Sequence, residues 1–116
     1  MDLHEKAVEA SKRFLKRSCG IEDDDFLDPV PNYFDIVHIE DRVIVFIKVY
    51  ESREELPNIK PNRSKCEEAA AEFLMNYFID QKKKVDMRLR FDAISLNILT
   101  DKQALLAHHV NCLGSE

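Results

Sequence analysis

The feature that most constrains the fold is an apolar run at residues 43–50, Val-Ile-Val-Phe-Ile-Lys-Val-Tyr. β-Branched and aromatic residues occupy both alternating faces of this run, and Lys48 is its one charged residue. A strand that is apolar on both faces has to be covered on both sides. We therefore expect a central strand of a β-sheet, with other elements packed above and below it.

The residues before this run are also rich in Tyr, Phe, Ile and Val, and three charged residues separate the two runs. This pattern predicts a β-hairpin. A two-residue turn at positions 40 and 41 would place Asp35 opposite Phe46. Lys48 would then be the diagonal neighbour of Asp35 on the same side of the sheet. A slip of one residue would break this register.

Two segments have apolar residues at helical spacing. Residues 3–18 form an amphipathic helix with basic residues in the last turn, followed by Gly20 as a C-cap. Residues 63–80 carry a full apolar stripe, from Cys66 to Phe78, and Ser64 with Glu67 matches a capping box. We expect both segments to be helices.

The remaining segments complete the sheet. Residues 88–98 alternate in polarity on two phases, which predicts one long strand with a bulge or two abutting strands. Residues 104–110 fit a strand or a short helix, and the proline-containing stretches 22–31 and 51–62 are expected to be loops. Taken together, the order predicts a single α/β domain over residues 1–116, a mixed β-sheet flanked by helices.

Charge and cysteine content narrow the function. Seventeen Lys and Arg against 22 Asp and Glu give a net charge of −5, the wrong sign for binding nucleic acid through the overall field. The three cysteines have no metal-site spacing and are expected to be reduced thiols. No stretch is long and apolar enough to cross a bilayer, and the first residues do not have the order of a signal peptide. We expect a soluble, cytoplasmic protein without a membrane role.

Several short motifs occur in a recognisable order along almost the whole chain. They are Glu5 with Ala7, Tyr-Phe-Asp-Ile-Val at 33–37, Val-Phe-Ile-Lys-Val-Tyr at 45–50, Lys65, Arg90-Phe91-Asp92, and Val-Asn-Cys-Leu at 110–113. In this order and spacing the chain resembles the YraN family of small proteins. The resemblance implies a restriction-endonuclease-like fold.

The resemblance also implies where a catalytic site would lie. In active nucleases of this fold, an Asp and a Glu-x-Lys from neighbouring strands meet, and their carboxylates hold Mg²⁺. Asp35 is present here, but Lys48 stands in place of the Glu, Tyr50 in place of the Lys, and Tyr33 in place of a further acid. An ammonium about 4 Å from a divalent cation opposes its binding by roughly 8 kcal/mol at an effective dielectric constant near 20. We therefore expect Lys48 to pair with Asp35 and occupy the vacated metal position.

These observations predict a non-catalytic, nuclease-like domain that binds DNA or RNA, or a protein that processes nucleic acid. The vestigial catalytic positions are Asp35, Lys48, Tyr50 and Glu5. Lys65 and Arg90 each belong to a local group of basic residues and are the expected nucleic-acid-binding residues. No metal or other cofactor is expected. The alternatives are a divergent Mg²⁺-dependent endonuclease that uses Asp35 with Glu5 and a relocated acid, and a structural or interaction module, such as a homodimer, without a nucleic-acid role.

The other chemically capable residues have simpler interpretations. His38 is expected to be a lone exposed histidine near the turn. His108 and His109 are adjacent, so on a strand they face opposite sides and cannot chelate one ion. Cys66 lies on the apolar stripe of its helix and is expected to be a core residue.

Overall fold

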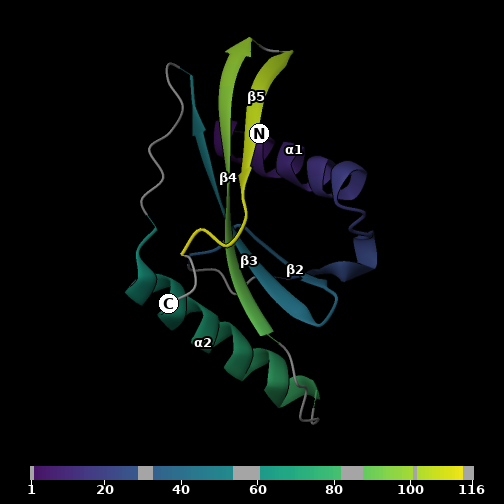
Figure 1. Ribbon diagram of the computed structural model, residues 1–116, viewed down its shortest axis with the longest axis vertical. Helices are drawn as coiled ribbons and strands as arrows, with labels where there is room; N and C mark the ends of the chain where they lie inside the picture. The colour runs from purple at the N-terminus through teal and green to yellow at the C-terminus, as the bar shows by residue number, and fades with distance from the viewer. Residues whose placement is uncertain (1, 29–32, 54–60, 82–87, 101, 114–116) are drawn as a thin grey trace.

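The computed structural model describes residues 2–28, 33–53, 61–81, 88–100 and 102–113, with the backbone alone for residues 78–81. Within these ranges, two α-helices and five β-strands follow one another along the chain (Figure 1). They are α1 (Leu3–Ser18), β1 (Phe26–Leu27), β2 (Ile36–Glu40), β3 (Val43–Ser52), α2 (Arg63–Gln81), β4 (Arg88–Thr100) and β5 (Gln103–His109). A short 3₁₀ turn (Asp23–Asp25) precedes β1.

The five strands form one mixed sheet in the order β1-β2-β3-β4-β5. β3 and β4 run parallel, with α2 between them in the sequence, and every other neighbouring pair is antiparallel. A parallel pair needs a long crossover connection, which the segment containing α2 provides. The structure thus confirms the expected α/β class, with a mixed sheet flanked by helices.

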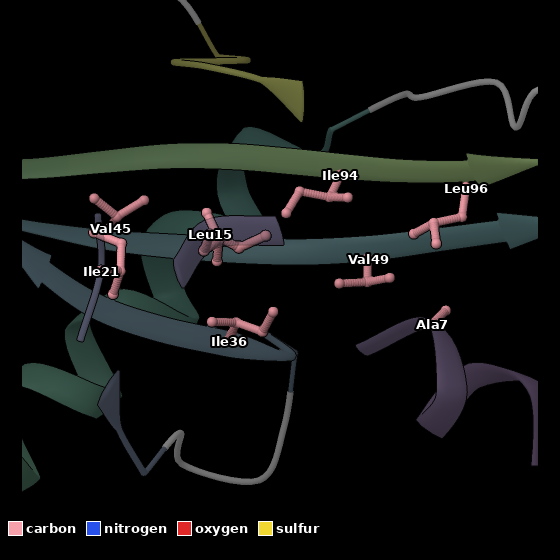
Figure 2. Close-up of a cluster of buried hydrophobic side chains, with 9 residues drawn as sticks. Ala7, Leu15, Ile21, Ile36, Val45, Val49, Ile94 and Leu96 are labelled. Atoms are coloured by element: carbon pink, nitrogen blue, oxygen red, sulfur yellow. The ribbon is translucent and has the colours of Figure 1, made fainter. Parts of the chain in front are cut away.

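β3 is the central strand, as its apolar faces predict. Four consecutive residues of β3, at positions 44–47, are fully buried. Val45, Ile47 and Val49 point toward α1 and pack with Leu15, as Figure 2 shows for the labelled side chains of this cluster. The intervening Phe46 points the other way and packs against Phe73 of α2, with ring centroids 5.4 Å apart. The chain therefore has two apolar layers, one on each face of β3.

The bounds of α1 agree with the expected helix. Its N-cap is Asp2, whose carboxylate accepts the backbone N–H of Glu5, and basic residues occupy its last turn. Gly20 follows with φ of 70°, a left-handed conformation that glycine adopts without steric cost. Residues next to each end of α1 thus set where the helix begins and ends, and both ends agree with the expected bounds.

The start of α2 differs in detail from the expected capping box. The Asn62 side-chain oxygen accepts the backbone N–H of Lys65 at 3.0 Å, and the helix begins at Arg63. Ser64 therefore lies inside the first turn, and the prediction that it caps the helix with Glu67 is wrong. Asn is as effective an N-cap as Ser. Asn62 comes directly before Arg63, the first residue of the helix, and therefore takes this role.

The hairpin between β2 and β3 has a different register from the expected one. The turn residues are Asp41 and Arg42, with φ of 48° and 64°, and Glu40 pairs with Val43. Consequently Phe46 lies opposite Val37, and the prediction that it lies opposite Asp35 is wrong. Two consecutive left-handed residues are typical of the hairpin turns that match the twist of the strands. Moving the turn by one position shifted the whole pairing.

The C-terminal part resolves two open alternatives. Residues 88–100 form the single strand β4, and residues 103–109 form a strand, β5, instead of a helix. The sequence also predicts that the three lysines at 82–84 end α2 in a basic turn, and they lie outside the described residues, as does the side chain of Phe78. Within the part of the chain that the structure describes, no helix is long and apolar enough to span a membrane.

Candidate functional site

Asp35 lies just before β2, and its carboxylate accepts a hydrogen bond from β3 in place of a backbone carbonyl of β2. Its backbone N–H donates to the Ile47 carbonyl oxygen at 2.9 Å. Its Oδ2 accepts the backbone N–H of Val49 at 2.7 Å. The carboxylate therefore satisfies a β3 donor that lies beyond the end of β2, and this contact fixes its position.

The other oxygen of Asp35 contacts His4 of α1. His4 Nε2 lies 2.7 Å from Asp35 Oδ1, and His4 Nδ1 lies 2.9 Å from Glu51 Oε2. Hydrogen bonds to Glu51 and then to Asp35 raise the pKa of His4, although burial opposes them. Each ring nitrogen faces a carboxylate oxygen, an arrangement that suits the imidazolium form because both of its nitrogens donate. We call these three residues the His4 bridge.

Lys48 lies on the face of β3 that carries Phe46 and is covered by α2, whereas the His4 bridge lies on the α1 side. Its ammonium donates to the Tyr33 carbonyl oxygen at 3.2 Å and lies 4.3 Å from the centroid of the Tyr33 ring. The ring of Tyr50 is 6.0 Å away. The predicted ion pair between Lys48 and Asp35 is therefore wrong. The pairing of β2 with β3, extended by one residue, would place Asp35 opposite Lys48. The two charges are separate because Asp35 lies before β2 and its carboxylate is held by the Val49 N–H and by His4.

The groups around Lys48 are weak acids. Burial raises the pKa of Tyr33 to about 12. Burial also raises the pKa of Tyr50 and of the Cys66 thiol, which is 4% exposed on α2. These hydroxyl and thiol groups are neutral at physiological pH. Cys66 is a core residue, as its helical position predicts.

Glu5 does not join the Asp35 carboxylate. It is exposed in the first turn of α1, whereas the adjacent His4 reaches the sheet. Sequence reasoning missed His4, although a signal was present. Position 4 is in phase with Ala7, Ser11 and Leu15, the buried side of α1.

Lys65 and Arg90 lie in different surroundings. Lys65 is exposed at the start of α2 and lines a shallow cavity of about 170 Å³ together with Glu68 and Glu72. Arg90 donates from Nε and Nη2 to the two oxygens of Asp92, both at 2.9 Å, and lies 3.4 Å from Glu40. Binding a phosphate through Arg90 would require it to leave two carboxylates. The nucleic-acid role of both residues stays a prediction.

Asp92 is the centre of a buried polar cluster on the α1 face. Its side chain is fully buried, and it also accepts from His108 Nε2 at 3.0 Å and the Asn111 N–H at 2.8 Å. Burial alone would raise the pKa of Asp92, but hydrogen bonds from His108, Arg90 and Asn111 outweigh it and hold the pKa below its usual value. The adjacent His109 contacts Ser95, 3.2 Å away, so the two histidines have separate partners, as expected.

His38 is buried, which contradicts the expectation of an exposed histidine. It is 1% exposed on the α1 face, beside the ring of Phe26. Neither ring nitrogen has a hydrogen-bond partner among the described residues. Burial lowers the pKa of His38, which favours the neutral ring. His38 pairs with Val45, so it lies on the face of the sheet that α1 covers.

The residues at the His4 bridge do not fit a Mg²⁺ site. Mg²⁺ requires oxygen ligands that are free to coordinate it. Both oxygens of Asp35 are engaged by N–H groups, and His4 lies between the two carboxylates. Among the described residues, no group of three or more His, Cys, Asp and Glu side chains is arranged to hold a metal ion.

Comparison with known proteins adds no relative to this picture. No protein-family model matches the chain, and a search of curated proteins gives no match. The resemblance to the YraN family therefore stays a prediction that rests on the motifs themselves.

Proposed function

We propose that this chain is a non-catalytic domain with a restriction-endonuclease-like fold, which binds nucleic acid or a protein that processes nucleic acid. The order of elements supports the fold. A helix, an antiparallel hairpin, a long helix and a strand parallel to the hairpin's second strand match the order that the motifs imply. A fold does not by itself establish a function, because function lies in the residues of a site.

One observation carries the proposal. The position that would supply the second carboxylate is occupied by Lys48, whose ammonium is fixed between the Tyr33 carbonyl and ring. The remaining acid, Asp35, is bound by His4 and by a β3 N–H. Both halves of the expected metal site are thus engaged in contacts within the chain. These contacts hold the strands together instead of leaving a site for a cation.

The catalytic part of the proposal is tested by a cleavage assay. Branched and single-stranded DNA are incubated with the protein and Mg²⁺ or Mn²⁺, and the melting temperature is measured with and without each metal. We expect no cleavage and no metal-dependent rise in melting temperature. Cleavage by the wild type that is lost in the Asp35→Asn variant would overturn the proposal.

The binding part is tested by filter binding at several salt concentrations. For a single strand, the logarithm of the affinity falls by about 0.7 per tenfold rise in salt for each phosphate that a cation neutralises. We expect a measurable slope, reduced by roughly this amount in Lys65→Ala. Arg17→Ala, an exposed change on α1, is the matched control. A chain with no salt-dependent affinity for DNA or RNA would instead be a structural or interaction module.

A second candidate is the divergent Mg²⁺-dependent endonuclease. The observation that favours it is the meeting of Asp35 and Glu51 at His4, which brings two carboxylates together at one end of the hairpin. In the His4→Ala variant these carboxylates would have no imidazolium between them. Metal-dependent stabilisation and DNA cleavage by this variant would support the second candidate. Absence of both would support the first.

A further inference from the structure

A groove lies between α1 and the hairpin formed by β4 and β5, and neither Lys48 nor the residues of the His4 bridge line it. Its volume is about 340 Å³. In Figure 1 one end of the β4–β5 hairpin extends past α1. Residues from this end of the hairpin and from α1 line the groove. We call it the basic groove. Its lining residues include Lys6, Ala7, Ala10, Arg13, Arg53, Leu96, Ile98 and Lys102.

Cationic side chains outnumber carboxylates in the basic groove. Counting only described residues, its lining has four cationic side chains, all exposed, and one carboxylate, Glu9. Elsewhere in the chain, Lys16 pairs with Asp23, and Arg90 pairs with Asp92. Over the described ranges of the chain, none of the four groove cations forms an ion pair. A local positive surface therefore exists on a chain whose net charge is −5.

The floor of the basic groove is aliphatic. Ala7 and Leu96 are almost fully buried there, and Ala10 and Ile98 are half-buried. Among the residues that the structure describes, no aromatic ring lines the groove. An occupant would therefore place aliphatic groups on the floor, whereas the stacked bases of a single strand are typically bound on aromatic rings.

The cations are spread over both walls. Lys6 and Arg13 are seven positions apart on α1, which corresponds to about 10.5 Å along the helix axis. Arg53 and Lys102 come from the opposite wall, after β3 and before β5. One small anion would not span this spread. A chain with several separated negative charges and aliphatic side chains between them would match it.

We propose that the basic groove docks an acidic, leucine- or alanine-containing peptide segment of a partner protein. Its carboxylates contact the four cations on the walls, and its aliphatic side chains lie on the floor. Complementary charge at the edge of such a surface steers encounter and sets which partner binds, whereas the buried apolar contacts hold the complex. The proposal goes beyond the proposed function and does not depend on nucleic-acid binding.

The test uses a fluorescein-labelled peptide of glutamate, alanine and leucine, measured by fluorescence anisotropy with the full chain. We expect saturable binding that weakens as salt rises. The double variant Arg13→Glu, Lys102→Glu should lower the affinity about tenfold or more. A second peptide with serine in place of leucine should also bind more weakly, because it has no side chains for the floor.

The matched control is the double variant Arg17→Glu, Arg88→Glu. Both residues are exposed and lie outside the groove, and the change in net charge is the same. We expect the control to retain most of the affinity. Backbone amide shifts in the wild type should change at Ala10 and Ile98 when the peptide is added.

Four results would overturn this inference. They are no binding of the peptide, an equal loss in the control, equal binding of the serine peptide, and an oligothymidylate that occupies the groove when the acidic peptide does not. Filter binding of nucleic acid is measured separately on the same variants. Failure of the peptide test therefore leaves the proposed function standing, and failure of nucleic-acid binding leaves the groove proposal standing.

Discussion

His4 joins α1 to the sheet through two carboxylates, and this contact should depend on pH. Its folded-state pKa lies above the unfolded value of 6.5. Its contribution to stability is therefore fully present below about pH 6.5 and is lost as the pH rises through the folded pKa. The His4 side chain is 43% exposed, so we expect no more than about 1 kcal/mol.

Comparing the wild type with His4→Gln checks this prediction. The difference in melting temperature should be largest at mildly acidic pH and shrink under alkaline conditions. A titration of the His4 ring by NMR should have its midpoint above 6.5. A midpoint at or below that value would show that the carboxylates do not hold the imidazolium.

His38 should respond in the opposite direction. Burial lowers its pKa, so the unfolded chain binds a proton before the folded one, and stability is lost as the pH falls below about 6.5. A buried polar group without a partner also costs about 1 to 3 kcal/mol. We expect His38→Leu to stabilise the fold by roughly 1 kcal/mol and to reduce its acid sensitivity.

Urea denaturation at two pH values measures both effects of His38→Leu. The control is His109→Leu, since His109 is exposed and contacts Ser95. It should give no stabilisation. If His38→Leu destabilised the protein at neutral pH, the ring would have a packing role that outweighs its unpaired nitrogens.

Asp92 is the residue whose loss should cost most. It is a fully buried carboxylate that Arg90, His108 and Asn111 all contact. Asp92→Asn would leave Arg90 with only the longer contact to Glu40. Breaking a buried ion pair costs about 3 to 5 kcal/mol, and we expect a loss near the lower end of this range. Because the folded pKa is lowered, the contribution is present above about pH 3.8 and is lost as the pH falls through the folded pKa.

Chemical denaturation of Asp92→Asn at neutral pH gives the measurement. Asp24→Asn, in an exposed position, is the control and should change stability by less than about 0.5 kcal/mol. A similar small effect for Asp92→Asn would contradict the central place of this carboxylate.

At the scale of elements, the hairpin turn stores strain that can be removed. Asp41 and Arg42 both have positive φ, where Asn-Gly is the favoured pair. The double variant Asp41→Asn, Arg42→Gly should raise stability by about 1 kcal/mol, measured by thermal unfolding. Arg17→Gly near the end of α1 is the control, and it should be neutral or destabilising. Equal gains at both positions would contradict the turn assignment.

At the scale of the whole molecule, β3 should be the most stable part of the fold. It is paired on both edges and buried on both faces, whereas β1 and β5 lie at the edges of the sheet. Hydrogen exchange should find the slowest amides at residues 44–47, opening only with global unfolding, and faster ones in β5. Slower exchange in β5 than in β3 would contradict this arrangement.

Much of this fold follows from the sequence, because helices and strands have periods that are local properties of the chain. The spacing of apolar residues placed α1 and α2, and the two apolar faces of residues 43–50 identified the central strand. The same reasoning placed Cys66 in the core. It also predicted that His108 and His109 face opposite sides of a strand, and in the structure they contact Asp92 and Ser95, respectively. Each of these outcomes depends on which side of an element a residue occupies.

The contacts of the candidate site depended on tertiary structure. The turn lies one position later than expected because two left-handed residues suit the twist of a hairpin. Asp35 does not pair with Lys48, because its carboxylate accepts the Val49 N–H instead. Asp35 then met His4, which is 31 positions away in the sequence. Periodicity decides which face a side chain occupies, but contacts between distant segments are decided only when the strands pair and α1 packs on them.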